Sequence, residues 1–219
     1  MASIENRILT SHVYDKIKQM IDEGVLPPGS RINKRELEEV LGVSQTPINE
    51  ALSRLAGEKF VVQESRRGYF VRAPSTRELV DLFAARAALE GMAARLCAQR
   101  GTTEEIEEIA TCFEGFELPL SKAEHDRYAV NDKHFHNLVV HYSGNSAIIE
   151  MSELFGVIIK SNQLGLVRPP EDTLDEHRAL IAALRGRDEE EAQRVMTEHH
   201  LRSREVLAEH LLQESDTGA

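Results

Sequence analysis

The stretch LGVSQTPINEALSRL at residues 41–55 constrains the fold more than any other part of the sequence. Asn33 can cap the preceding helical stretch KRELEEVL, and Gly42 can supply the left-handed turn that ends it. Ser44 or Thr46 can then cap a second helix, whose first turn contains a proline that is tolerated there. The pattern predicts two helices joined by a tight turn.

A third helix and a hairpin flank this pair. The spacing of four apolar residues predicts a helix near the N-terminus: Ile8, Val13, Ile17 and Ile21. After residue 58, the β-rich runs FVVQE and YFVRA are joined by SRRG, where Gly68 can adopt a positive φ angle. Three helices followed by a hairpin predict a winged helix-turn-helix domain over residues 1–74.

The chain beyond Pro74 has helical patterns and no strand pattern. Polar capping residues precede several of these stretches, namely Ser75, Thr102, Ser121 and Asp188, with a glutamate three residues after each of the last three. The expected helices are 76–100, 102–116, 121–143, 146–164, 173–184 and 188–213. The sequence therefore predicts a mostly α protein, in which an antiparallel all-helical bundle over residues 75–219 follows the winged domain.

Charge divides the chain in the same way. The 219 residues carry a net charge of −11, but residues 1–74 hold 11 Lys and Arg against 10 Asp and Glu, a net charge of +1. The remaining residues therefore carry −12. We expect the two parts to have different partners, because an acidic surface does not attract nucleic acid.

The sequence gives no sign of export or of a membrane segment. It has no run of about 18 apolar residues, and Glu5 lies where a secretory signal would be apolar. We expect a cytoplasmic protein. Cys97 and Cys112 have neither metal-binding nor redox spacing, and both lie in helical patterns, so we interpret them as buried thiols.

Several motifs resemble a known family. The run PPGSRINKRELEEVLGVSQTPINEALSRLAGEKFVVQESRRGYFV resembles the DNA-binding domain of GntR-type bacterial transcription regulators. The remainder, with RAALE, DKHFH, a helix ending at SGN and EHRALIAAL, resembles the FCD effector domain of the FadR subfamily. The resemblance covers nearly the whole chain. It implies a homodimeric repressor or activator whose affinity for a DNA operator changes when a small metabolite binds the helical domain.

The second helix of a helix-turn-helix reads DNA with its amino-terminal residues, which here would be Ser44, Gln45, Thr46 and Asn49. In the family, the positions matching Gln45 and Asn49 are commonly arginine. Arginine pairs with guanine, whereas asparagine and glutamine pair with adenine. We therefore predict an operator that carries A·T pairs where relatives read G·C.

Positive charge for phosphate contacts must come from other residues. Arg35 matches a family position that contacts DNA. Arg66 and Arg67, next to Gly68 at the wing tip, can enter the minor groove or bind phosphates, although a solvated turn is the alternative. Weaker candidates are Lys34 and Arg31.

Eight of the nine histidines lie after Pro74. Asp132 and His136 are four residues apart and project from one face of a helix, while His177 and His199 lie in two later helices. Three imidazoles with one carboxylate suit Zn²⁺ or Ni²⁺ and leave coordination positions open. By spacing alone this is one of many possible sets of acids and histidines.

The resemblance favours this set. Metal-binding FCD domains use an Asp-x-x-x-His pair and two histidines from separate later helices, which Asp132, His136, His177 and His199 match. His200 is the rival of His199, but the match of MTEHH favours His199. The remaining histidines are expected to face elsewhere or to lie at the surface or in packing positions: His125, His134, His141 and His210.

Arg86, in RAALE, matches a family position that reaches the effector cavity, where its guanidinium could bind a carboxylate. The alternative is an exposed helix arginine. A metal with open positions near an arginine implies a small organic acid as effector. The metal could instead be a structural clip, or the bundle could bind another ligand class.

Two other functions compete with a ligand-responsive regulator. The first is a metal-dependent hydrolase fused to a DNA-binding domain, with Glu90 or Glu176 as the base. The second is a constitutive DNA-binding scaffold whose helical part only dimerises. We expect a regulator and no enzyme, because no convincing additional base accompanies the four candidate ligands.

Overall fold

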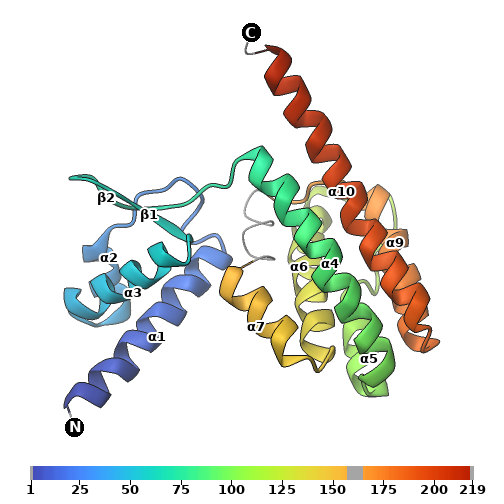
Figure 1. The fold of residues 1–219 in the computed structure, drawn as a ribbon, viewed down its shortest axis with the longest axis horizontal. Helices are drawn as coiled ribbons and strands as arrows, with labels where there is room; N and C mark the ends of the chain where they lie inside the picture. The colour runs from blue at the N-terminus through green and yellow to red at the C-terminus, as the bar shows by residue number, and fades with distance from the viewer. Residues whose placement is uncertain (1, 157–164, 218–219) are drawn as a thin grey trace. The chain divides into compact units, whose positions relative to one another are not determined.

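The computed structural model describes residues 2–156 and 165–217. It divides into two compact units, Met1–Pro74 and Ser75–Ala219 (Figure 1). The part of the expected 146–164 helix from residue 157 onward lies outside the described residues. Within the described ranges, no helix is long and apolar enough to cross a membrane.

The N-terminal unit is a winged helix-turn-helix, as predicted. Its elements are α1 (Ala2–Asp22), α2 (Lys34–Leu41), α3 (Gln45–Gly57), β1 (Val61–Glu64) and β2 (Gly68–Val71). The two strands form an antiparallel hairpin in which Val61 pairs with Val71. Arg31 forms an isolated bridge with Phe70, which attaches the segment before α2 to the hairpin.

Local signals place the two central helices. The Asn33 side chain accepts a hydrogen bond from the backbone N–H of Arg35, and Gly42 ends α2 in the left-handed conformation at φ 66°. Ser44 precedes α3 with an extended backbone but makes no side-chain capping bond. Buried apolar residues of α1, α3 and the hairpin form the core beneath them: Ile17, Ile48, Leu52, Leu55, Phe60 and Val61.

The described part of the second unit is all-helical, which confirms the predicted fold class (Figure 1). Its helices are α4 (Thr76–Arg100), α5 (Thr103–Thr111), α6 (Lys122–Tyr142), α7 (Ser146–Phe155), α9 (Pro170–Arg185) and α10 (Glu189–Thr217). The expected 102–116 helix is shorter than predicted, because the chain turns after Thr111 and reaches a positive φ angle at Gly115. Full capping boxes begin α4, α5 and α6.

Helices α4 and α10 approach closely along their length (Figure 1). At Gly91 of α4, an added Cβ would lie only 2.2 Å from Oγ1 of Thr197 in α10. The Thr197 hydroxyl donates a 3.4 Å hydrogen bond to the carbonyl of Ala87. Because Gly91 has no side chain, α4 and α10 can approach closely, and this brings the histidines of α10 toward α4 and α6.

Candidate functional site

The exposed start of α3 consists of polar residues, namely Ser44, Gln45 and Thr46. Nε2 of Gln45 donates a 3.0 Å hydrogen bond to Glu38, and Oδ1 of the partly buried Asn49 accepts a 2.9 Å bond from Nζ of Lys34. Both amides therefore form hydrogen bonds with side chains of α2.

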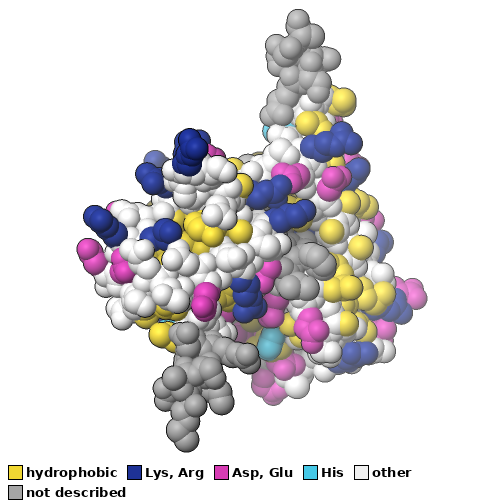
Figure 2. Space-filling view, turned by 60° about the vertical axis from the view of Figure 1, so that its left-hand side comes forward, with side chains coloured by type: hydrophobic (Ala, Val, Ile, Leu, Met, Phe, Trp, Pro, Cys, Tyr) yellow, Lys and Arg dark blue, Asp and Glu magenta, His cyan; other side chains and the backbone are white. Residues whose placement is uncertain are grey.

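The wing tip carries two exposed arginines. Arg66 adopts φ 64° and Gly68 φ 102°, so the turn places both in the left-handed half of conformational space. Arg67 pairs with Glu64, and its guanidinium lies 5.0 Å from the centre of the Phe70 ring. On the face shown in Figure 2, Lys and Arg side chains occur at several separate points, with uncharged surface and some acidic side chains between them. They do not form one continuous basic patch on that face.

Arg35 lies in the first turn of α2 and is exposed. The wing and the start of α2 thus both present guanidinium groups to solvent. These groups are available for contacts with an anionic backbone, whereas the amides on α3 are suited to hydrogen bonds with base edges.

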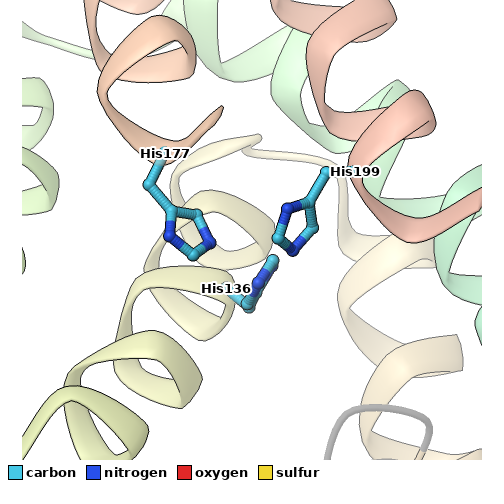
Figure 3. Close-up of side chains that lie close together, drawn as sticks. All are labelled: His136, His177 and His199. Atoms are coloured by element: carbon cyan, nitrogen blue, oxygen red, sulfur yellow. The ribbon is translucent and has the colours of Figure 1, made fainter. Parts of the chain in front are cut away.

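Three buried histidines from three helices converge in the second unit (Figure 3). His136 of α6, His177 of α9 and His199 of α10 bring nitrogen atoms within 4.8 Å of one another. Oδ1 of Asp132 lies 3.4 Å from Nε2 of His177 and 4.0 Å from Nε2 of His136. The structure therefore brings together all four residues that the sequence analysis selected.

Each of the three imidazoles has its Nδ1 atom next to a polar group of the surrounding shell. Nδ1 of His136, His177 and His199 lies 2.7, 2.9 and 2.7 Å from, respectively, Oε2 of Glu90, the hydroxyl of Tyr128 and Oε2 of Glu176. The contacts of His177 and His199 are hydrogen bonds, whereas Nδ1 of His136 makes no hydrogen bond to Glu90 despite the short distance. Because metal-binding histidines use one ring nitrogen for the ion and the other for such a partner, Nε2 is the atom left for a metal on His177 and His199.

The residues fit a divalent cation. Nε2 of His177 is buried and has no hydrogen-bond partner among the described residues. Burial lowers the pKa of His177 well below its ordinary value and that of His199 to about 4, so both rings are neutral at pH 7. Burial raises the pKa of Asp132, a cost that a nearby cation would offset. Neutral imidazole with one carboxylate is a suitable donor set for Zn²⁺ or Ni²⁺.

Glu90 forms a second buried group. It accepts a 2.6 Å bond from Nε of Arg86, while Nε2 of His200 lies 2.9 Å from its Oε2 atom. Although burial opposes ionisation, the charge of Arg86 and contacts from His200 and His136 hold the pKa of Glu90 well below its ordinary range. The distances from Glu90 to Arg86 and to His200 are hydrogen-bond lengths. We therefore interpret this group as support for His136, although Glu90, His136 and His200 also meet the spacing required for an ion.

Arg86 is buried, so its alternative interpretation as an exposed helix residue is wrong. It lines a small cavity of about 20 Å³ together with Asp132, His136, His199 and Arg168. Three of the four candidate ligands and two guanidinium groups thus border one space. The cavity has room for little more than water and would have to widen to hold an organic acid.

The sequence analysis missed the supporting roles of several residues. Tyr128 and Arg168 were not selected, and Glu90 and Glu176 were considered only as bases. No local pattern identifies them, because their partners lie on other helices. Of the remaining histidines, His134, His141 and His210 are exposed and His125 is 40% exposed, as expected.

Comparison with known families identifies the chain. Residues 9–71 match the family described as bacterial regulatory proteins, gntR family, and residues 81–202 match the FCD domain. The protein belongs to the GntR family and carries an FCD domain. This GntR-family chain is a bacterial DNA-binding transcription regulator.

Two relatives agree with the family match. The HTH-type transcriptional repressor GlaR of Escherichia coli is 30% identical over 199 residues, which cover 86% of this chain and 90% of that protein. A probable D-xylose utilization operon transcriptional repressor of Paenarthrobacter nicotinovorans is 29% identical, over 87% of this chain and 85% of that protein. The matched families and these relatives are transcription regulators and not enzymes.

Solved structures share the fold. The structure of E. coli McbR/YncC has a TM-score of 0.74 at 24% identity, over 93% of this chain and 98% of that one. A GntR regulator from Rhodococcus sp. RHA1 has a TM-score of 0.73 at 18% identity, over 91% and 97% of the two chains. A winged-helix domain followed by a helical domain is therefore a fold that this chain shares with both structures.

Proposed function

We propose that this regulator is a cytoplasmic homodimer whose operator binding is modulated by a small organic acid, bound beside a divalent metal in the helical domain. Residues 1–74 form the DNA-binding domain, and residues 75–219 hold the metal, the effector and the dimer contacts. A twofold dimer would read an operator with two half-sites.

The convergence of His136, His177 and His199 with Asp132 carries this proposal. Burying four polar groups together is costly unless they are paired or bind an ion. The uncompensated Nε2 of His177 supports an ion at this point. Zn²⁺ or Ni²⁺ is the expected metal because most of the donor atoms are imidazole nitrogens.

The metal, when bound, supplies an electrophilic centre with positions open to water or to a carboxylate oxygen. The chain itself supplies the charge and shape around that centre. Arg86 lines the adjacent cavity and is held by Glu90, so its guanidinium enters the site in a fixed orientation. A carboxylate is the ligand that suits both groups, because guanidinium and divalent metal each bind its oxygens.

The DNA-binding role rests on the amides of Gln45 and Asn49 in α3 and on the guanidinium groups of α2 and the wing. We assign contacts with DNA bases to Ser44, Gln45, Thr46 and Asn49. We assign contacts with the DNA sugar-phosphate backbone to Arg35, Arg66, Arg67 and Gly68. The effector acts if it binds more tightly to one arrangement of the DNA-binding domains than to another. By linkage, DNA then changes effector affinity by the same factor.

Selection of random duplex DNA by the purified protein tests the function, with and without a metal chelator. We expect an enriched inverted repeat and an affinity that falls steeply as salt concentration rises. Metal content is measured on the same protein after dialysis with Zn²⁺ or Ni²⁺. His136→Ala should lose the metal, whereas His134→Ala, on the exposed face of the same helix, should retain it.

The outcomes separate the alternatives. An inverted repeat whose affinity is the same with and without metal and candidate carboxylates would support the constitutive scaffold. A metal that stabilises the fold but leaves operator affinity unchanged would show a structural clip. Failure to enrich any sequence under either condition would contradict the assignment of α3 as the reading helix.

A further inference from the structure

Glu176 is adjacent to two candidate metal ligands: it is next to one in the sequence and contacts the other in space. It directly precedes His177 in α9, but its carboxylate faces α10, where Oε2 lies 2.7 Å from Nδ1 of His199. Its side chain is 13% exposed. The carboxylate also binds Arg168 and Arg202. Glu176 therefore contacts one histidine and two guanidinium groups, and its carboxylate lies outside the cluster of three imidazoles.

The contact with His199 determines which ring nitrogen carries the proton. A carboxylate has only acceptor atoms when it is ionised, so at 2.7 Å the hydrogen lies on Nδ1. Nη2 of Arg168 lies 3.3 Å from the same Nδ1, but it donates to Glu176 and to the carbonyl of His199. In a neutral imidazole this leaves the lone pair on Nε2. Nε2 is the nitrogen free to face His136 and His177, whose ring centres lie 5.2 and 4.7 Å from that of His199.

The surroundings keep Glu176 ionised. The guanidinium groups of Arg168 and Arg202 both donate hydrogen bonds to its carboxylate, and their positive charges favour the ionised form. A protonated Glu176 could donate to Nδ1 and would stabilise the opposite tautomer. The two arginines therefore act on His199 through the charge of this carboxylate.

Arg168 fixes the position of the carboxylate relative to α10. Its Nη1 donates a 3.0 Å bond to Glu176, its Nη2 a 3.2 Å bond to the carbonyl of His199, and its Nε a 3.1 Å bond to Oγ of Ser203. The Ser203 hydroxyl donates to the same carbonyl at 3.2 Å. The buried guanidinium of Arg168 thus bonds both to the Glu176 carboxylate and to the backbone carbonyl of His199.

We propose that Glu176 is the positioning residue of His199: it fixes the Nδ1–H tautomer and the ring orientation, which makes Nε2 the atom that binds the metal. This inference rests on the proposed metal site. It assigns Glu176 a role other than that of a catalytic base, because the carboxylate is already bonded to three cationic or N–H groups and lies behind the ligand.

The chain offers a matched pair of substitutions. Glu176→Gln keeps the shape of the side chain but allows its NH₂ group to donate to Nδ1, which favours the Nε2–H tautomer. Glu198→Gln is the control, because Glu198 directly precedes His199 and also binds Arg202, but its side chain is 39% exposed. Both changes remove one negative charge near Arg202, but only Glu176→Gln changes a group that contacts the imidazole of His199.

Two measurements are made on each protein. Imidazole ¹⁵N NMR of the metal-free protein at neutral pH reports the tautomer of His199, and competition with a chromophoric chelator gives the affinity for Zn²⁺ and Ni²⁺. We expect Nδ1–H in the wild type and in Glu198→Gln. Glu176→Gln should shift toward Nε2–H and bind metal about 10–100-fold more weakly.

An unchanged tautomer and an unchanged metal affinity in Glu176→Gln would overturn the inference. A wild type that shows Nδ1–H at His199 but binds neither metal would contradict the proposed metal site while supporting the tautomer assignment. If Glu176→Gln does not fold, Glu176→Asp provides the test, since a retained carboxylate should keep Nδ1–H. Loss of that tautomer in the aspartate variant would also count against the proposal.

Discussion

Nζ of Lys34 donates a 2.9 Å hydrogen bond to Oδ1 of Asn49, which joins α2 to α3, the helix that we propose as the reading helix. The same ammonium group lies 5.9 Å from the centre of the Tyr69 ring in the hairpin. Lys34 is therefore held between the wing and the reading helix, and its hydrogen bond fixes which way the Asn49 amide faces.

This contact gives Lys34 a different role from Arg35. Lys34→Met should reduce the discrimination at the base pair that Asn49 reads, by part of the roughly 1–3 kcal/mol that a good bidentate contact provides. Arg35→Met should instead weaken binding to all DNA sequences about equally. It should also lower the slope of log affinity against log salt concentration by about 1. Competition binding of the selected operator and single-base variants, at several salt concentrations, distinguishes the two. A uniform loss in Lys34→Met would show that the lysine contacts phosphate.

Gln45→Arg should move the preference at one base pair of each half-site from A·T to G·C, because arginine pairs with guanine O6 and N7. Glu38 would compete for the new guanidinium, since it already accepts a bond from Gln45. The change is therefore best made together with Glu38→Gln, with Glu38→Gln alone as control. Random-sequence selection measures the result, and a wild-type operator that already carries guanines at these positions would contradict the hypothesis.

Gly91→Ala tests the close approach of α4 and α10. The added methyl would meet Oγ1 of Thr197, and overpacking of this kind costs about 1–3 kcal/mol, against a gain of about 1 kcal/mol in helix propensity. In a Thr197→Ala background the clash is absent, so the same change should raise the free energy of unfolding. Urea unfolding of the four proteins gives the coupling energy.

A matched control lies in the other unit. Gly57, in the last turn of α3, has nothing within 4 Å of an added Cβ, so Gly57→Ala should be neutral or stabilising. If Gly91→Ala behaved like Gly57→Ala in the wild-type background, the proposed steric role of Gly91 would be wrong.

The buried histidines make the helical domain sensitive to acid. Burial lowers the pKa of His199 to about 4 and that of His200 to about 3, from an ordinary value of 6.5. Between these values and 6.5 the unfolded chain binds more protons than the folded one. Stability should therefore fall as pH falls from about 6.5, by up to about 1.4 kcal/mol per pH unit for each group.

Urea unfolding with chelator at pH 7.5, 6.0 and 5.0 measures this dependence. His199→Gln should reduce the slope below pH 6.5, whereas His134→Gln, on an exposed position, should leave it unchanged. Equal slopes in the wild type and in His199→Gln would mean that this ring takes up its proton in the folded state at the ordinary pKa.

Much of the fold was predictable because its signals are local. Ser121 and Glu124 form a capping box within four residues, and Gly42 needs only its own backbone angle to end α2. Predicted apolar faces were less accurate at their ends. Ile8 fits the predicted helical stripe but is 66% exposed, because a period locates a helix face without showing where the neighbouring elements end.

The candidate site was predictable only in part. Asp132 and His136 share a helix, so their spacing places them together, whereas His177 and His199 were selected through the resemblance to FCD domains. Glu90 and Tyr128 could not be placed beside the histidines from sequence alone. Their contacts with His200 and His177 join residues 110 and 49 positions apart, and no local pattern specifies such a pairing.

Glu90 is shared by Arg86, His136 and His200, and this sharing restricts how the site can change during evolution. Losing the carboxylate leaves a guanidinium and two imidazoles without their common partner, and losing either histidine leaves the buried carboxylate with one contact fewer. Stepwise replacement must therefore pass through a destabilised intermediate. We expect these four residues to be inherited as a block, with relatives that lack the acid also lacking the histidine pair.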